Sequence, residues 1–245
     1  MPANLKKSVT YIVGITMTYD GNIMVAAHGA LFLVDRDLNF KAIYPLTGED
    51  VENSICTDEQ GVYVVTSKRM LKVVWTGSKL SIDEADGGWQ SEYNTMTRQQ
   101  ATAAGALTIS GGSGTTPTLM GFGNDPDKLV VISDADPSGA QVVAVWRDKI
   151  PPGFKQKPGT RSARIADQIR TDISKVTIEP SAAVLGYGVV VLNGSYPKPL
   201  ADIWGNAFTS GISRPAPFGV QKFNWNTQTK SFEKAWVTWR LITPT

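Results

Sequence analysis

The sequence repeats one pattern, a pair of short apolar runs joined by a tight turn. Runs of this length, rich in Val, Ile and Leu and bounded by turn residues, are typical of β-hairpins. Four copies occur, at residues 22–35, 61–75, 128–146 and 186–225, the last with a long insertion between its two runs. The expected turns are His28–Gly29, Ser67–Lys68 and residues 134–139. The pattern predicts a chain built mainly of antiparallel strands.

Each hairpin is preceded and followed by one more strand-like run, which makes a unit of four strands. The first three units recur every roughly 40 to 65 residues, within reach of the spacing expected of propeller blades. Such a unit buries its faces only against similar neighbours, so radial stacking is favoured. We therefore predict an all-β fold, a β-propeller of four-stranded antiparallel blades, forming a single domain over residues 1–245. The predicted blades are residues 9–45, 52–85, 115–171 and 175–239.

Two segments fall outside the repeat. Residues 86–114 are predicted to be mostly a long surface connection between the second and third blades. The insertion at residues 195–217 is rich in Pro and Gly and carries Trp204 and Phe208. Ordered insertions of this kind often cover a site, but they also cap exposed core, and the sequence leaves both alternatives open.

Composition limits the classes of function. Of the 245 residues 42% are hydrophobic, enough for a substantial core, and the formal net charge is only +2. This balance argues against the concentrated basic face of a nucleic-acid-binding protein. Cys56 is the single cysteine, which excludes an internal disulfide and a cysteine metal cage. We expect neither a signal peptide nor a membrane-spanning helix, and we leave the cellular location open.

Several longer motifs resemble a known family. The stretches MTYDGNIMVA, VENSICTDEQGVYVVTSKRMLKVVW, LSIDEADGGW, LVVISDADP and VLGYGVVVLN are similar to bacterial proteins described as quinoprotein-like or uncharacterised β-propellers. The resemblance covers nearly the whole chain and implies a propeller fold. Members of that family are usually longer and often exported, and this chain resembles one short of its C-terminal blades. Three outcomes are then open: a compact four-bladed ring, an open arc that forms a homodimer and so completes an eight-bladed ring, or a truncated fragment. We favour the homodimer.

The stretch from Gly111 to Gly139 contains two patterns that resemble ligand loops. The glycine-rich part lacks the lysine and the following helix of a phosphate-binding loop. Asp134, Asp136 and Ser138, followed by Gly139, match the first half of a calcium loop, but the twelfth position is Val145 rather than Glu. Asp, Pro, Ser and Gly also favour hairpin turns, so we prefer a polar turn and keep Asp134 and Asp136 as candidate metal ligands.

The expected blade order places polar residues from all four units at one face. The turns bring His28, Lys68, Asp134 and Asn193 to the same face as Asn53, Thr116 and Glu179, which begin innermost strands. We predict that Asn53, Thr116, Glu179 and Asn193 contact a ligand at the central channel. Glu179 lies in an apolar run, where a carboxylate needs a partner. Glu179 and His28 are the weak candidates for catalysis, with Asp134 or Glu179 as the carboxylate that would orient His28.

Three functions remain open. The favoured one is a non-catalytic propeller that binds a small molecule or protein at its channel face. The second resembles the calcium-dependent lactonases, in which a central ion polarises an ester carbonyl; the ligands here would be Glu179, Asn53, Asn193 and Asp134. The third, a quinone-dependent dehydrogenase, follows from the family resemblance alone. The expected cofactor is thus none or Ca²⁺, and no nucleic acid or membrane partner is expected.

Overall fold

The computed structural model describes residues 9–97, 99–100, 114–174, 178, 180–198, 200 and 202–239. Over these residues the protein is built of four antiparallel sheets whose strands follow chain order. The first sheet contains β1 (Ile12–Met17), β2 (Ile23–Ala27), β3 (Ala30–Val34) and β4 (Phe40–Pro45). The second contains β5 (Cys56–Asp58), β6 (Gly61–Val65), β7 (Arg69–Trp75), β8 (Leu80–Ser81) and β9 (Trp89–Glu92).

The last two sheets have the same layout. The third contains β10 (Thr118–Met120), β11 (Leu129–Asp136), β12 (Gly139–Trp146) and β13 (Ile165–Arg170). The fourth contains β14 (Ala183–Leu185), β15 (Gly188–Leu192), β16 (Val220–Asn226) and β17 (Ser231–Thr238). The prediction of an all-β chain with four blade-like sheets is confirmed; the first, third and fourth have four strands each, and β9 adds a fifth strand to the second.

The central hairpins turn where the sequence predicts. His28–Gly29 connects the Ala27–Ala30 pair, and Gly29 takes a φ of 86°, which a residue with a side chain adopts only at a cost. In the second sheet the Thr66 hydroxyl accepts bonds from the Lys68 and Arg69 amides and fixes that turn. The third hairpin is tighter than predicted, because β11 extends to Asp136 and β12 begins at Gly139.

The segment after the second blade, predicted to be mostly a surface connection, contains a strand that the sequence did not predict, and its residues 98 and 101–113 lie outside the described residues. Trp89 and Ser91 are buried and alternate with exposed neighbours, and β9 pairs with β7 from Arg69 to Lys72. The outer position of the second sheet is therefore shared between β8 and β9, with the 3-10 turn Glu84–Asp86 between them.

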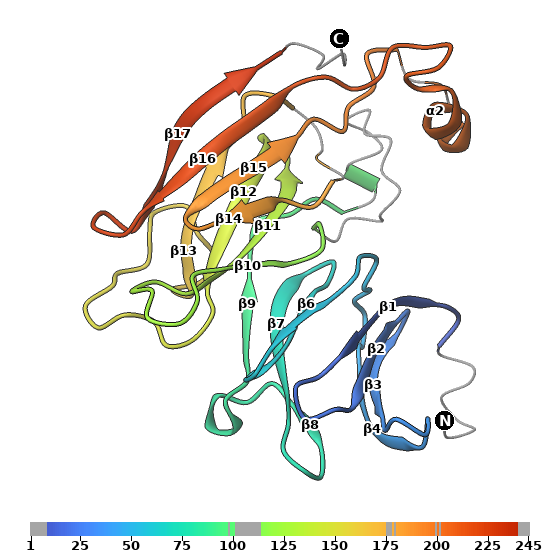
Figure 1. The fold of residues 1–245 in the computed structure, drawn as a ribbon, viewed down its shortest axis with the longest axis vertical. Helices are drawn as coiled ribbons and strands as arrows, with labels where there is room; N and C mark the ends of the chain where they lie inside the picture. The colour runs from blue at the N-terminus through green and yellow to red at the C-terminus, as the bar shows by residue number, and fades with distance from the viewer. Residues whose placement is uncertain are drawn as a thin grey trace.

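Three apolar layers hold the sheets together. One lies between the first and second sheets, one between the second and third, and one between the third and fourth. Among the described residues no such layer joins the fourth sheet to the first. The four sheets follow one another along an arc, and α2 (Ile203–Thr209), in the insertion of the fourth sheet, projects at one end (Figure 1). In the described part of the chain, no helix has the length and apolar character needed to span a membrane.

Candidate functional site

The turns β2–β3, β6–β7 and β11–β12 lie at the same end of the sheets, which we call the hairpin face. On this face a hollow of about 570 Å³ separates the hairpin tips of the second and third sheets. Its lining is mostly polar and includes Lys68, Asn94, Thr95, Asp136, Ser138 and Arg161. Two neighbouring sheets thus supply the polar side chains of one depression.

Hydrogen bonds fix the floor of this hollow. The Gln141 amide donates to the carbonyl of Asn94 at 2.7 Å, and the Thr95 hydroxyl donates to Asp134 Oδ2 at 2.8 Å. Asp134 and Gln141 form a cross-strand pair, so both point from the third sheet toward the second. The chain that follows β9 is therefore held against β11 and β12.

The charges lining the hollow are mostly paired. Arg161 lies 3.1 Å from Glu92, and Arg170 forms an ion pair with Asp136. Lys68 differs, because no described carboxylate lies within 4.0 Å of its ammonium group. Among the described residues, the hollow therefore offers one positive charge without a carboxylate partner, beside paired charges and neutral polar groups, an arrangement suited to a polar ligand.

Two of the predicted ligand-contacting residues lie at the inner edge of the same face. Asn53 Nδ2 donates to the carbonyl of Gly114 at 2.6 Å, which connects the starts of the innermost strands of the second and third sheets. Thr116 is half-buried, two residues before β10. The segments that contain Asn53 and Thr116 therefore lie side by side, and the role of these two residues in binding stays a prediction.

Asn193 and His28 have local partners. Asn193 accepts a bond from the Ser195 amide at 2.8 Å and donates to the carbonyl of Phe218 at 2.9 Å, so it joins the two ends of the insertion. His28 Nε2 lies 2.9 Å from Asp50, so the carboxylate beside it is neither of the two that we predicted. Glu179, the other predicted catalytic candidate, lies outside the described residues.

The aspartates of the predicted calcium loop are already engaged. Asp136 accepts a bond from the Ser138 amide at 2.7 Å and pairs with Arg170, as expected of a polar turn. Asp134 accepts bonds from the Ala135 amide and from Thr95. In the part of the chain that the structure describes, no group of three or more His, Cys, Asp or Glu side chains could hold a metal ion. Calcium binding stays a prediction that would require these contacts to rearrange.

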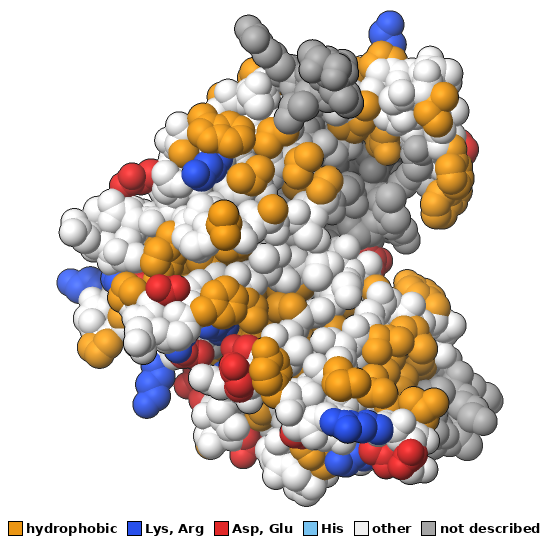
Figure 2. Space-filling view, viewed as in Figure 1, with side chains coloured by type: hydrophobic (Ala, Val, Ile, Leu, Met, Phe, Trp, Pro, Cys, Tyr) orange, Lys and Arg blue, Asp and Glu red, His pale blue; other side chains and the backbone are white. Residues whose placement is uncertain are grey.

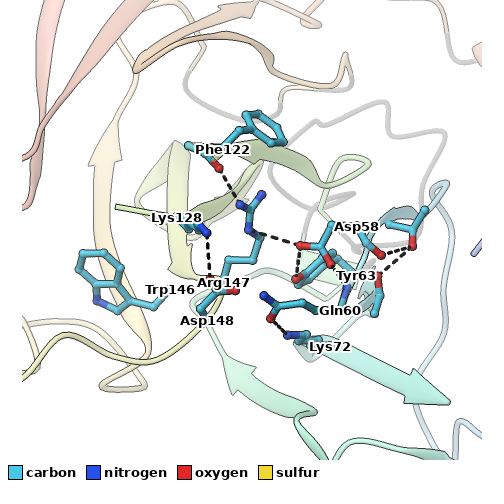
Figure 3. A network of polar contacts seen from close by, with 12 residues as sticks. Asp58, Gln60, Tyr63, Lys72, Phe122, Lys128, Trp146, Arg147 and Asp148 are labelled. Atoms are coloured by element: carbon cyan, nitrogen blue, oxygen red, sulfur yellow. Dashed lines mark hydrogen bonds and ion pairs between the residues drawn. The ribbon is translucent and has the colours of Figure 1, made fainter. Parts of the chain in front are cut away.

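A second polar group, which was not predicted, lies at the opposite end of the sheets. We call this end the loop face. Here Arg147 reaches from the third sheet to the second, and its Nε lies 3.5 Å from Asp58 (Figure 3). Asp58 also accepts the Tyr63 hydroxyl at 2.9 Å, and Arg147 Nη2 donates to the carbonyl of Gly121. The Trp89 indole donates to the carbonyl of Arg147 at 2.8 Å.

Burial perturbs the ionisable groups of the loop face. It raises the pKa of the Tyr63 hydroxyl, an effect that the Asp58 carboxylate increases. Burial and Asp58 also raise the pKa of the Cys56 thiol to about 12. Burial lowers the pKa of Lys72. One sequence signal could have found this group: Lys72 interrupts the apolar run of residues 70–75, where a charged side chain needs a specific environment.

Comparison with known proteins gives relatives without an assigned activity. An uncharacterised protein of Archaeoglobus fulgidus is 31% identical over an alignment of 244 positions, which covers 93% of this chain and 45% of the relative. The chain thus spans less than half the length of that relative. No known protein family matches the sequence.

Two solved structures similar to this chain belong to proteins of unknown function. One from Desulfotomaculum acetoxidans has a TM-score of 0.46 and 11% identity, covering 96% of this chain and 59% of its own. One from Bacteroides caccae has a TM-score of 0.34 and 12% identity, covering 87% of this chain and 77% of its own. The resemblance to an uncharacterised protein rests on the Archaeoglobus relative, and neither a quinoprotein family nor a propeller family is shown.

Proposed function

We propose that the protein is a non-catalytic binding scaffold, a four-sheet arc that a second copy closes into a ring of eight sheets. The hairpin face around the central channel of that ring would bind a polar ligand or partner. The observation that supports this proposal best is the composition of the outer face of the first sheet, the face turned away from the second sheet.

Strand register places three rows of four residues on that outer face. The rows are Ile12, Ala27, Ala30 and Pro45; Ile15, Val25, Phe32 and Ile43; and Met17, Ile23, Val34 and Phe40. All twelve are apolar. A sheet with one solvated face normally alternates apolar and polar residues, whereas a sheet apolar on both faces is typical of one packed between two others.

Part of this face is open to solvent. Ile12, Ile15 and Met17 of β1 are 56%, 58% and 58% exposed. Hydrophobic side chains gather over β1 and the neighbouring strands of the first sheet, and others lie over the fourth sheet (Figure 2). Monomeric proteins rarely leave a contiguous apolar area of this kind uncovered, so it indicates an interaction surface.

The fourth sheet presents the matching end of the arc. Val190, Leu192, Val220 and Trp236 share its outer face by strand register, and Leu192 and Trp236 are 42% and 46% exposed. Lys222 lies among them. This face is less uniformly apolar than that of the first sheet, but it offers the aromatic and aliphatic groups that form the centre of interfaces.

A two-fold dimer would cover both ends at once. The first sheet of each copy would pack on the fourth sheet of the other, so the same contact would form twice. Four strands spaced about 4.8 Å apart, with about five residues each, give a footprint of roughly 320 Å² per face. The four faces of a dimer then cover about 1,300 Å², within the range of specific interfaces.

The solution mass tests the proposal. We expect light scattering behind size exclusion to give twice the chain mass of 26.5 kDa at micromolar concentration. Ile15→Lys and Trp236→Lys should each produce monomers, because either substitution places a charge in both contacts of the ring. Leu38→Lys is the matched control, since Leu38 is 72% exposed in the turn between β3 and β4. A monomeric wild type, or a dimer insensitive to both substitutions, would refute ring closure by a second copy.

A further inference from the structure

A layer of buried charge lies between the second and third sheets at the loop face. Lys72 and Arg147 are each 4% exposed, and Arg164 and Asp58 are each 8% exposed. Arg147 lies 3.5 Å from Asp58 and Arg164 lies 3.0 Å from Glu84, so Lys72 is the buried cation of this layer that has no carboxylate within 4.0 Å among the described residues. Buried charges are normally paired, so Lys72 indicates an anion that the described residues do not supply.

Lys72 is the cation with the weakest pairing. Register places it between Tyr63 and Trp89 on the face that packs against the third sheet. Its ammonium group donates to Gln60 Oε1 at 3.0 Å (Figure 3), and no described carboxylate lies within 4.0 Å of it. One neutral amide oxygen does not compensate a buried ammonium group.

A cavity of about 630 Å³ adjoins this lysine. Its walls include Lys72, Lys149, Arg164, Glu84, Asp148 and Trp89. The volume lies within the range of small-molecule sites, about 300–1,000 Å³. The second sheet supplies Lys72 and Trp89, while Asp148, Lys149 and Arg164 follow or precede strands of the third sheet.

Some charged side chains in the cavity walls form ion pairs with each other, and others remain able to contact a ligand. Arg164 lies 3.0 Å from Glu84, and these two charges offset each other. Lys149, like Lys72, has no described carboxylate within 4.0 Å. Asp148 Oδ1 has no hydrogen-bond partner among the described residues, and Oδ2 is 3.9 Å from Lys128. The cavity thus presents two unpaired ammonium groups and one carboxylate oxygen that can accept a hydrogen bond.

We infer that this cavity binds a short dicarboxylic acid that carries a hydroxyl group. One carboxylate pairs with the buried Lys72 ammonium, the other with Lys149 at the rim, and the hydroxyl donates to Asp148. Charge-assisted hydrogen bonds of this kind are stronger than those between neutral groups. The inference does not depend on ring closure, because all the groups belong to one copy.

Isothermal titration calorimetry of the whole chain tests this inference, with L-malate as the probe. We expect saturable binding of L-malate, weaker binding of succinate, which lacks the hydroxyl, and none of dimethyl succinate, which lacks the charges. Lys72→Gln should weaken L-malate binding at least about tenfold, the value of one charged hydrogen bond. Lys149→Gln, at the exposed rim, should weaken it less, by about threefold.

Lys155→Gln is the matched control, because it removes the same charge from an exposed position outside the cavity and should bind like the wild type. Circular dichroism checks that each variant is folded; if Lys72→Gln is not, Lys149→Gln decides. The inference is overturned if L-malate gives no saturable heat up to about 10 mM, if dimethyl succinate binds as well as L-malate, or if the folded cavity variants bind like Lys155→Gln. A protein that binds L-malate as a monomer would support the site while refuting the proposed ring.

Discussion

Substitution of Lys72 by Met should stabilise the protein near neutral pH. Met keeps the length of the apolar stem but removes an ammonium group that is 4% exposed and bonded only to Gln60. Burying such a charge costs several kcal/mol in desolvation, and attraction to nearby carboxylates offsets part of that cost. Losing the bond to Gln60 subtracts about 1 kcal/mol from the gain. We expect a net increase of about 1–2 kcal/mol in the free energy of unfolding, within the range found when buried charges are replaced.

The gain should depend on pH in one direction. Burial lowers the pKa of Lys72 in the folded state; Asp58 and Asp148 oppose this shift, and Arg147 and Arg164 add to it. Below the folded-state pKa the lysine is charged in both states, and the full cost of burying it is present. Between the folded and unfolded pKa values the unfolded chain binds more protons, so the stability of the wild type rises with pH. The advantage of Lys72→Met should therefore shrink as the pH approaches about 10.4, the ordinary lysine pKa.

Urea unfolding of both proteins at pH 7 and pH 10, followed by tryptophan fluorescence and circular dichroism, measures this difference. Lys155→Met is the control, and its stability should lie within about 0.5 kcal/mol of the wild type at both pH values. A variant that is less stable than the wild type at pH 7, or a gain that grows at pH 10, would show that Lys72 is well compensated within the chain. The reasoning behind the anion site would then lose its electrostatic basis.

Three further predictions test other parts of the structure. Asp127→Ala should lower the free energy of unfolding by about 2–4 kcal/mol, because it leaves the buried Trp225 indole, 2.8 Å from Asp127 Oδ2, without an acceptor. Asp127→Asn, which keeps an acceptor oxygen, should cost about half as much in chemical denaturation, and equal losses would contradict this account. Since Asp136 pairs with Arg170, adding about 5 mM CaCl₂ to chelator-treated protein should shift the melting temperature by less than about 1 °C; a larger rise in differential scanning fluorimetry would support calcium binding. The pKa of Cys56 is raised to about 12, so its reaction with a disulfide reagent at pH 8 should be much slower in the folded protein than in urea, and equal rates would show an accessible thiol.

In the candidate sites, residue patterns predict the positions of turns but not the contacts between sheets. The position of a turn follows from adjacent residues, so Lys68 could be placed on the hairpin face before the structure was known. The partner of His28 could not, because Asp50 arrives from the link between the first two sheets. Asp58 and Arg147 likewise belong to different sheets, and their contact depends on the angle at which those sheets pack.

The strand β9 shows the same limit within one sheet. Trp89 and Ser91 alternate with polar residues over only four positions, too short a run to identify a strand next to glycines. β8 pairs only with Val74 and Trp75 at the end of β7, so the edge of β7 from Arg69 to Lys72 is left for β9. Because the partner strand lies outside the local window, no pattern within residues 86–95 specifies it.

The sequence alone determined the four sheets, their strand order and their central turns, because two-residue alternation and turn preferences act between neighbours in the chain. Tertiary structure alone decided that apolar layers join the sheets into an arc, that the outer face of the first sheet is only partly covered, and that Lys72 is buried with no carboxylate within 4.0 Å among the described residues. These features arise where separate sheets meet, and their energies depend on distances and burial that no stretch of neighbouring residues defines.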